Sequence, residues 1–178
     1  MNTKVGNKIR WKNKDKAKDK VYTPQEVAED CMDKIRHKIK PHHHLFEPFY
    51  GKGAFYDLFG DNPKSYTEID LGLDFFEIPD DIEIDYIITN PPYSIMTDII
   101  KKMMKMKNLK GFGMLVNNLT MTPCRLQTFV DNGFYPTDRY YFKIHSWFGY
   151  CDFWFFEKIE GPVKPLVNMT FKKSQYMF

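Results

Sequence analysis

The sequence is poor in cysteine and has no long apolar run. It contains 178 residues and three cysteines, Cys31, Cys124 and Cys151. Because the cysteines are odd in number and far apart, we expect free thiols in a reducing compartment, not a disulfide framework or a zinc site. No segment approaches the roughly 18 uncharged apolar residues of a membrane helix, and the polar, lysine-rich start does not have the pattern of a secretory signal. These absences predict a cytoplasmic protein with no membrane partner.

The net charge is small but unevenly distributed. The whole chain carries +3, whereas residues 1–20 contain seven lysines, Arg10 and two acids, a local charge of +6. Such a segment has too few apolar residues to pack, so we expect residues 1–20 to form a basic, disordered arm. This arm is either a solvated tail or a phosphate-binding segment that adds salt-dependent affinity for nucleic acid.

The rest of the sequence predicts one α/β domain. With 43% hydrophobic and 17% aromatic residues it has enough apolar surface for a sizeable core. Apolar, β-branched runs alternate with amphipathic segments, which favours a mostly parallel sheet with right-handed crossovers. The expected strands are 44–46, 65–69, 85–89 and 111–116, and the expected helices are 25–38, 54–59, 97–107 and 123–130. Residues 138–145 and 152–158 indicate a C-terminal antiparallel hairpin, and a tail follows at 161–178.

Two details of this organisation concern single residues. Thr23, with Glu26 three residues later, has the pattern of an N-cap for the first helix. His42, His43 and His44 are adjacent, and neighbouring residues of a strand point to opposite faces, so they do not converge readily on a metal ion. We therefore expect no metal site.

The most informative stretch is Asn90-Pro91-Pro92-Tyr93, directly after an apolar strand. The side-chain oxygen of Asn90 can accept a hydrogen bond from a planar amino group. Pro91 has no backbone N–H, which leaves the carbonyl groups around it as further acceptors, and the two prolines stiffen the turn. Tyr93 offers a flat face on which a base can stack.

A second motif, Glu47-Pro48-Phe49-Tyr50-Gly51-Lys52-Gly53, lies between an expected strand and a short helix. Glycines in such a turn let the backbone approach a ligand closely. A Walker-type phosphate loop is not indicated, because Lys52 is followed by Gly53 in place of Ser or Thr. The acid Glu47 suits a cationic or hydroxyl-bearing cofactor better than a phosphate.

Together the two motifs resemble those of S-adenosylmethionine-dependent DNA amino-methyltransferases, the adenine-N6 branch in particular. The resemblance covers roughly residues 21–158 and implies a Rossmann-like methyltransferase fold over 21–160. It also implies a bacterial or phage-host cytoplasm. The residues it implies for S-adenosylmethionine are Tyr22, Thr23, Pro24, Glu47, Pro48, Phe49, Gly51, Gly53, Asp70, Asp74, Phe75 and Asn90. In this scheme Asp70 binds the cofactor ribose and Phe75 covers the cofactor adenine.

The resemblance further implies the reaction and its substrate. Asn90, Pro91, Pro92 and Tyr93 would form the catalytic turn that receives the N6 amino group of adenine in DNA. Tyr93, with Trp147 or Phe148 of the terminal hairpin, would sandwich the base, which must be flipped out or already unpaired; ordinary hairpin packing is the alternative for those two. The three cysteines are not needed as nucleophiles.

Departures from the family leave several alternatives open. Tyr50 and Lys52 replace the small residues usual between the glycines, and no target-recognition domain is present. The alternatives are that specificity comes from short loops, the basic arm, a specificity subunit or a second copy of the chain, or that it is low. Single-stranded DNA and RNA are alternative substrates, a protein amide is another, and a catalytically silent nucleic-acid-binding subunit of the same fold is the remaining interpretation.

Overall fold

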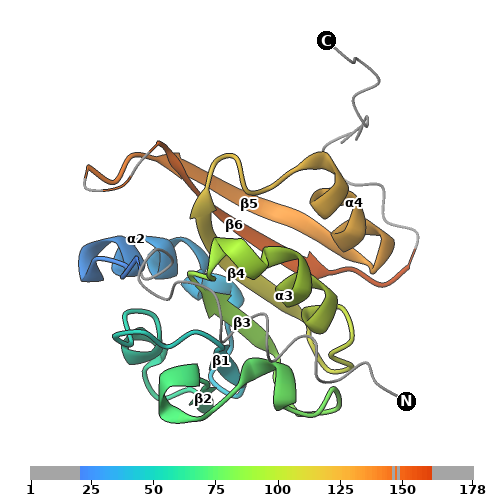
Figure 1. Ribbon diagram of the computed structural model, residues 1–178. Coiled ribbons are helices and arrows are strands. Elements are labelled where there is room, and N and C mark those ends of the chain that lie inside the picture. The colour runs from blue at the N-terminus through green and yellow to red at the C-terminus, as the bar shows by residue number, and fades with distance from the viewer. Residues whose placement is uncertain (1–20, 146, 148, 162–178) are drawn as a thin grey trace.

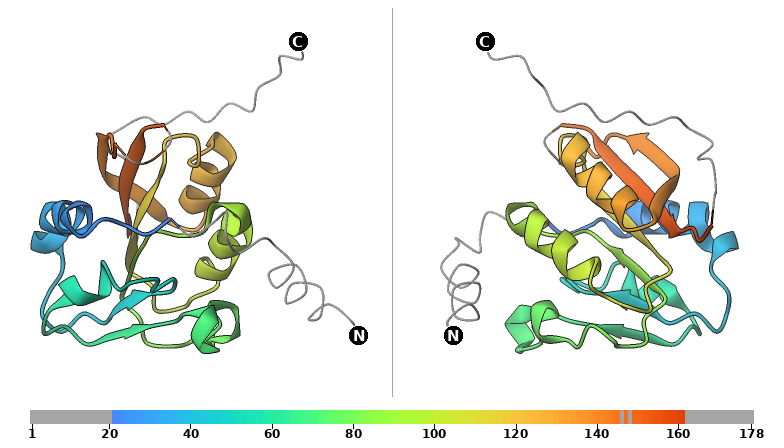
Figure 2. Two further views of the ribbon diagram at one scale, coloured as in Figure 1. Left: turned by 60° about the vertical axis from the view of Figure 1, so that its left-hand side comes forward. Right: turned by 90° about the vertical axis from the view of Figure 1, so that its right-hand side faces the viewer.

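The computed structural model describes residues 21–145, 147 and 149–161 of the chain. Within them, a six-stranded sheet lies between two layers of helices (Figure 1). Figure 2 shows helix α2 on one side of the sheet and helices α3 and α4 on the other. The chain therefore has the α/β architecture that its alternating pattern predicts.

The helices and strands have the following bounds. The α-helices are α2 (Gln25–Ile35), α3 (Met96–Met103) and α4 (Pro123–Asp131). The strands are β1 (Leu45–Glu47), β2 (Lys64–Tyr66), β3 (Tyr86–Thr89), β4 (Gly111–Asn117), β5 (Phe134–Phe142) and β6 (Cys151–Lys158). Single turns of 3-10 helix are η1 (Arg36–Lys38), η2 (Tyr56–Phe59), η3 (Ile69–Leu71), η4 (Phe75–Glu77) and η5 (Tyr93–Ile95).

The strand order is β2-β1-β3-β4-β6-β5. The first four strands in this order are parallel, whereas β6 is antiparallel to both β4 and β5. The expected parallel sheet with an inserted antiparallel strand is therefore confirmed. The parallel strands end at one edge of the sheet, which is where open α/β sheets bind their ligands.

Two apolar clusters cover the two faces of the sheet. One joins α3 and α4 to the sheet and includes Met96, Ile99, Phe112, Phe129 and Phe156. The other joins α2 and η2 to the opposite face, with Cys31, Ile35, Phe55, Phe153 and Phe155. Burial on both faces explains why residues 151–156 of β6 are all buried and lack the alternation of a half-exposed strand.

Several boundaries differ from those expected. Thr23 is not the N-cap of α2; Pro24 holds that position, and its carbonyl oxygen accepts hydrogen bonds from Val27 and Ala28. Helix α3 ends at Met103 and continues only as i→i+3 turns to Met106. Strand β2 ends at Tyr66, three residues earlier than its apolar pattern suggests.

The remaining expectations concern the ends of the chain and the membrane. The basic arm 1–20 and all but the first residue of the tail 161–178 lie outside the described residues. No helix in the described part of the chain is long and apolar enough to cross a bilayer.

Candidate active site

Four loops meet at the carboxyl edge of the parallel strands. The glycine turn, residues 47–53, follows β1; Thr67 and Glu68 follow β2; the acceptor turn, residues 90–93, follows β3; and Asn117 ends β4. Most of the functional residues expected from the sequence lie in the first three of these loops. The parallel register brings together motifs that are about forty residues apart in the chain.

The glycine turn is tightly folded around Tyr50. Gly51 and Gly53 both have positive φ angles, 56° and 77°, which side chains rarely adopt. The Gly53 N–H donates to the Tyr50 carbonyl over 2.7 Å. A Cβ atom at Gly53 would lie 2.7 Å from the Tyr50 hydroxyl oxygen. Both glycines are therefore required by this backbone, and the Tyr50 side chain already fills the space beside the second one.

Glu47 lies beneath the glycine turn, with 3% of its surface exposed. Its Oε2 atom accepts a hydrogen bond of 2.8 Å from the Tyr56 backbone N–H, at the start of η2. Burial raises the pKa of Glu47 well above its usual range. Its neighbours Pro48 and Phe49 are buried and half-buried; the Pro48 carbonyl accepts from the Thr67 hydroxyl, and Phe49 packs on Phe75. This carboxyl group thus ties the turn to the following helix.

Glu68 is the acid that touches the glycine turn. Its Oε2 atom accepts from the Gly51 backbone N–H over 2.8 Å, and its Oε1 atom accepts from the Asp70 N–H over 3.3 Å. Asp70, the acid expected from the sequence, is exposed on η3. The early end of β2 explains the difference, because it puts Glu68 in the loop directly beyond the strand. For this reason the sequence pattern points to Asp70 and not to Glu68 as the acid beside the glycine turn.

Asp74 and Phe75 lie next along the chain and have structural contacts. The Asp74 Oδ1 atom accepts from the Phe76 N–H over 2.9 Å and caps η4. Phe75 is only 2% exposed and packs against Phe46 and Phe49. Leu71 and Leu73, which flank Gly72, are the exposed apolar side chains of this loop.

The segment Val21–Pro24, here called the entry segment, connects the two motifs. The Asn90 side-chain Nδ2 donates to the Val21 carbonyl over 3.0 Å. The Tyr22 ring lies 3.4 Å from the position that a Cβ atom of Gly51 would occupy, and the Lys52 ammonium lies 4.6 Å from the centre of that ring. The residues expected at this place from the sequence, Tyr22 to Pro24, therefore run between the glycine turn and the acceptor turn.

The acceptor turn is half-buried and stiff. Pro91 is buried, Asn90 and Pro92 are half-buried, and the Tyr93 ring packs against the cluster beneath α3. The Tyr93 hydroxyl is fully buried, and burial raises the pKa of this phenol. Tyr93 therefore stays a neutral phenol with its polar end turned inward, so the stacking role expected from the sequence would fall to its ring.

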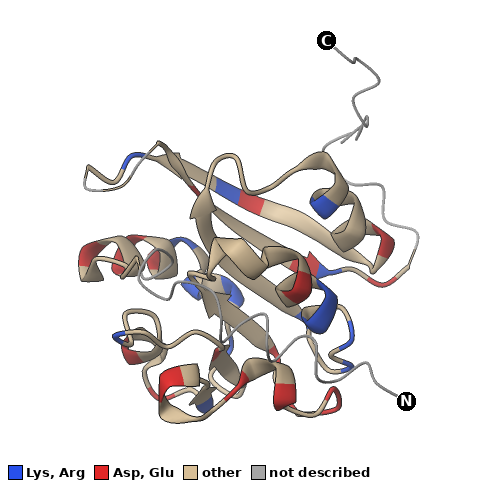
Figure 3. Cartoon of the chain, viewed as in Figure 1, with Lys and Arg blue, Asp and Glu red and all other residues tan. Residues whose placement is uncertain are grey.

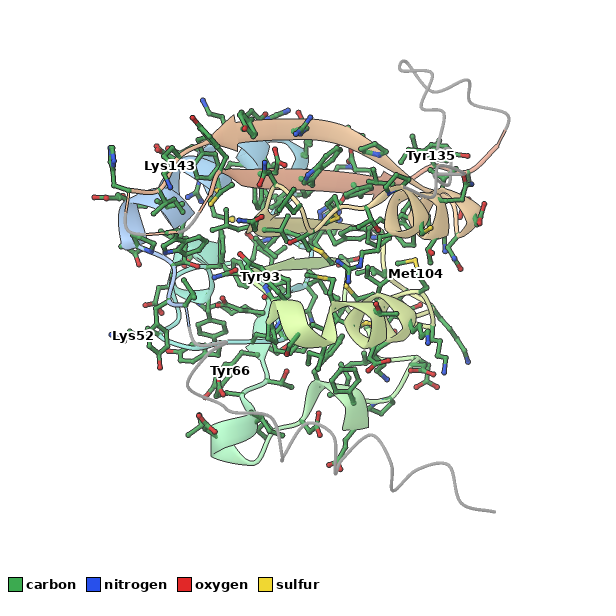
Figure 4. The ribbon with its side chains drawn as sticks, turned by 45° about the horizontal axis from the view of Figure 1, so that its top comes forward. Lys52, Tyr66, Tyr93, Met104, Tyr135 and Lys143 are labelled. Carbon is green, nitrogen blue, oxygen red and sulfur yellow. The ribbon has the colours of Figure 1, made fainter. Side chains whose placement is uncertain are left out.

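The sequence predicts that Trp147 or Phe148 of the hairpin faces the substrate. Trp147 is half-buried and packs against the cluster beneath α2, whereas Phe148 lies outside the described residues. The Lys143 ammonium donates to the carbonyls of Trp147 and Gly149 over 2.5 and 2.6 Å and so closes the loop between β5 and β6. Figure 4 shows Lys143 and Lys52 toward the same side of the molecule as Tyr93, while Met104 and Tyr135 lie toward the opposite side.

Thiol and metal chemistry have little support in the described residues. Cys31 and Cys151 are buried, and burial raises the pKa of both thiols, which keeps them protonated at neutral pH. The three adjacent histidines bond to different partners. His43 Nδ1 accepts from the Lys40 N–H, His44 Nε2 contacts the Ser65 hydroxyl, and the exposed His42 packs edge-on against the His43 ring. No group of three or more potential metal ligands occurs within the described ranges.

Comparison with known proteins gives structural similarity without sequence similarity. No protein-family model matches the chain, and no curated protein matches its sequence. A solved complex of E. cuniculi Mtq2 and Trm112, which methylates the translation termination factor eRF1, includes a chain similar to this one with a TM-score of 0.57 and 16% identity. That match covers 78% of this chain and 98% of the other.

Two further structures extend the comparison. The 23S rRNA methyltransferase ErmE matches with a TM-score of 0.61 and 10% identity, over 79% of this chain and 70% of its own. The magnesium protoporphyrin IX methyltransferase of Synechocystis, solved with bound S-adenosylmethionine, matches with a TM-score of 0.60 and 9% identity, over 76% and 79%. Identities this low establish architecture and not substrate. The chain has the Rossmann-like fold of the methyltransferases.

Proposed function

We propose that this chain transfers the methyl group of S-adenosylmethionine to the exocyclic N6 amino group of adenine in DNA. The observation that carries the proposal is the meeting of the glycine turn and the Asn90–Tyr93 turn at one sheet edge, joined by the entry segment. Either motif alone occurs in ordinary turns. Their convergence in a methyltransferase fold supports a cofactor site beside an acceptor for a planar amino group.

The residues of the first site fit this cofactor. Gly51 is exposed and lets a ligand approach the backbone, and the Glu68 carboxylate beside it suits ribose hydroxyls. The exposed Leu71 and Leu73, in place of the buried Phe75, are the side chains that we assign to the apolar surface of the cofactor adenine. When bound, S-adenosylmethionine supplies an electrophilic methyl group on a sulfonium, and this is the only chemistry the protein needs from it.

Asn90 has the geometry of an amino-group acceptor. Because its Nδ2 donates to the Val21 carbonyl, its Oδ1 is left to accept a hydrogen bond from a ligand. The amino nitrogen of adenine is a poor nucleophile because its lone pair is delocalised into the ring. Acceptors at Asn90 and the Pro91 carbonyl favour the pyramidal nitrogen whose lone pair can form the new N–C bond while the C–S bond breaks. The methylated nitrogen then loses a proton to water, so no strong base is required.

The basic arm supports a polyanionic substrate. Residues 1–20 carry a net charge of +6, and the next residue, Val21, is the one bonded to Asn90. The sequence thus attaches its largest excess of positive charge directly beside the acceptor turn. Phosphate groups of a strand whose base reaches Asn90 are the natural counterions of this arm.

Mass spectrometry of nucleosides tests the substrate. The chain is incubated with methyl-labelled cofactor and DNA, RNA or protein, and the products are hydrolysed and identified. Labelled N6-methyladenine from DNA is the expected product. A label found only in an RNA base or in a protein amide would reassign the substrate, as the rRNA and termination-factor enzymes of the same fold illustrate. If none of the three is methylated, the remaining interpretation is a catalytically silent binding subunit.

Replacement of Asn90 tests the catalytic turn. We expect Asn90→Ala to lower kcat by about 100-fold or more, the usual cost of one transition-state hydrogen-bonding group, while binding of S-adenosylhomocysteine is retained. Asn132→Ala is the matched control, because the side chain of this exposed asparagine at the end of α4 donates to the Thr128 carbonyl, away from the acceptor turn. Full activity in Asn90→Ala would refute the assignment.

A further inference from the structure

Two tyrosines form an exposed stack on the hairpin. Tyr141 near the end of β5 and Tyr150 just before β6 have ring centroids 5.2 Å apart and an interplanar angle of 17°. Their exposed fractions are 54% and 50%, so about half of each side chain remains accessible to a ligand. An aromatic pair whose side chains remain about half exposed is a platform for a further planar group, with the outer face of Tyr150 as the accessible ring face.

The platform is held in place by its neighbours. The Arg139 Nε and Nη2 atoms donate to the two oxygens of Asp152 over 2.9 and 3.2 Å, and Asp152 is 1% exposed. The same guanidinium lies 5.6 Å from the Tyr141 ring and 4.9 Å from the Trp154 ring. The Tyr150 carbonyl accepts from the Asn118 N–H over 3.0 Å. Tyr141 and Tyr150 are thus presented on a fixed base, and little ordering entropy is lost when a ligand binds.

Charge on this part of the hairpin favours an anionic partner. Residues 142–151 include Lys143 and His145 and contain no Asp or Glu, whereas the charge of Arg139 is paired with Asp152. Figure 3 shows Lys or Arg but no acid on the described part of the loop that joins β5 to β6, whereas acids are frequent on α2. Lys143 has three N–H donors, of which the carbonyls of Trp147 and Gly149 take two. The remaining donor suits a phosphate oxygen.

The platform lies on the same face of the sheet as the acceptor turn. The strand registers align Thr89 with Met114, Met114 with Trp154, and Trp154 with Arg139. Arg139 and Tyr141 are two residues apart, so they share this face. Thr89 directly precedes Asn90, and Tyr93 packs into the same cluster as Trp154. A strand whose base reaches Asn90 therefore has its neighbouring nucleotides on the side of Tyr141 and Tyr150.

We propose that the Tyr141–Tyr150 platform stacks on an unpaired base next to the target base, and hence that the substrate is single-stranded DNA. The inference rests on the proposed function and names the form of its substrate. A base offers its flat face to an aromatic ring only when it is unstacked, as in a single strand, whereas a duplex hides these faces. A planar, anionic and flexible strand is the occupant that matches both the stack and the remaining donor of Lys143.

Binding of short oligonucleotides, measured by fluorescence anisotropy without cofactor, tests the platform. The probes are a single-stranded oligodeoxynucleotide with one adenine, its duplex, and the same strand with abasic sites beside the adenine. We expect the parent chain to prefer the intact single strand to both others. The double variant Tyr141→Ala, Tyr150→Ala should bind this strand about tenfold more weakly, and the double variant with Phe at both positions should bind like the parent.

Controls make the result specific. Tyr135→Ala, at the far end of β5 (Figure 4), should leave the affinity unchanged. If the double Ala variant fails to fold, the abasic strand still tests stacking on the parent chain. Equal affinity of the parent for intact and abasic strands, or tighter binding of the duplex, would overturn the inference.

Measuring methyl transfer as well as binding distinguishes a failure of this inference from a failure of the proposed function. A parent chain that prefers the single strand but never methylates it would contradict the proposed reaction and leave the platform supported. A parent chain that methylates adenine with the same KM as the double Ala variant would leave the reaction supported and remove the platform.

Discussion

Two halves of the sheet are stabilised by different contacts. The glycine-turn half consists of β1, β2 and their loops, and the hairpin half consists of β4, β6 and β5. Strands β1 and β2 have three residues each, and the loops after them are fixed by single side chains, such as Glu47 on Tyr56 and Glu68 on Gly51. Strands β4, β6 and β5 have seven, eight and nine residues and share long ladders with stacked aromatic rings. The first half is held by a few polar contacts and local ring contacts, whereas the second has long ladders with extensive packing.

This difference predicts which property each half controls. A lost contact in the glycine turn should change ligand binding more than it changes the free energy of unfolding. A lost ring in the hairpin half should do the reverse. Four substitutions test this difference, and they follow from the largest expected effect to the smallest.

Phe156→Ala should destabilise the chain by about 3–5 kcal/mol, the usual cost of removing a buried phenylalanine. Phe156 is fully buried, with its ring 4.7 Å from that of Phe112 and 4.8 Å from that of Phe129. Urea denaturation measures the change. Leu119→Ala, at a side chain that is 79% exposed, should stay within about 0.5 kcal/mol of the parent. A Phe156 variant as stable as the Leu119 variant would contradict the assignment of stability to this half.

Glu68→Gln should weaken cofactor binding by about tenfold, because the acceptor that we assign to the ribose hydroxyls loses its charge. Stability should change little, because the amide oxygen can still accept the exposed hydrogen bond from the Gly51 N–H. Calorimetric titration with S-adenosylhomocysteine measures the affinity. Asp70→Asn, two residues away on the exposed side of η3, is the matched control and should have the smaller effect. A larger loss in Asp70→Asn would restore Asp70 as the principal acid.

Glu47→Gln should change how stability depends on pH. Burial raises the pKa of Glu47 in the folded chain above its value in the unfolded chain. The folded chain therefore holds this proton more tightly, and the contribution of Glu47 to stability falls as the pH rises from its unfolded pKa through its folded pKa.

The glutamine variant lacks this titration and still offers a carbonyl oxygen to the Tyr56 N–H. The difference in stability between variant and parent should therefore move in favour of the variant as the pH rises from about 4. Denaturation curves at several pH values measure it. A constant difference across this range would show that Glu47 ionises as it does in the unfolded chain.

Lys52→Gln should have the smallest effect. Its ammonium lies over the Tyr22 ring at an exposed position, where cation–π contacts contribute about 0.5–1 kcal/mol. We expect the affinity for S-adenosylhomocysteine to fall by less than fivefold. Lys52→Arg keeps a cation over the ring and should have the parent affinity. If Lys52→Arg binds as weakly as Lys52→Gln, the cation–π contact does not hold the entry segment.

Much of the fold follows from local pattern. The apolar runs before Asn90 and before Asn117 predict buried parallel strands, and the two C-terminal runs predict the hairpin, because these signals come from adjacent residues. The end of β2 was missed because Thr67 and Ile69 continue the strand pattern, although Glu68 leaves the ladder to accept from Gly51. A contact with a residue 17 positions away has no local signature.

The site shows the same limit. The motifs at residues 47–53 and 90–93 are visible in sequence because each is short and contiguous. The burial of Phe75 and the Tyr141–Tyr150 stack are not visible, because they depend on which face of the sheet each residue occupies. Adjacent aromatic residues in this hairpin look alike in sequence, and only the register separates the buried Phe153 from the exposed Tyr141.

The opposite orientations of the two ends of the described domain have a practical consequence for labelling. The chain enters beside the acceptor turn, through the Val21 carbonyl held by Asn90, whereas β6 ends at Lys158 next to the start of β4, on the far edge of the sheet. In the proposed function, a fluorophore or affinity handle attached at Val21 would compete with an incoming strand for the space beside the acceptor turn. One attached at Lys158 would lie at the opposite edge of the sheet, away from the acceptor turn.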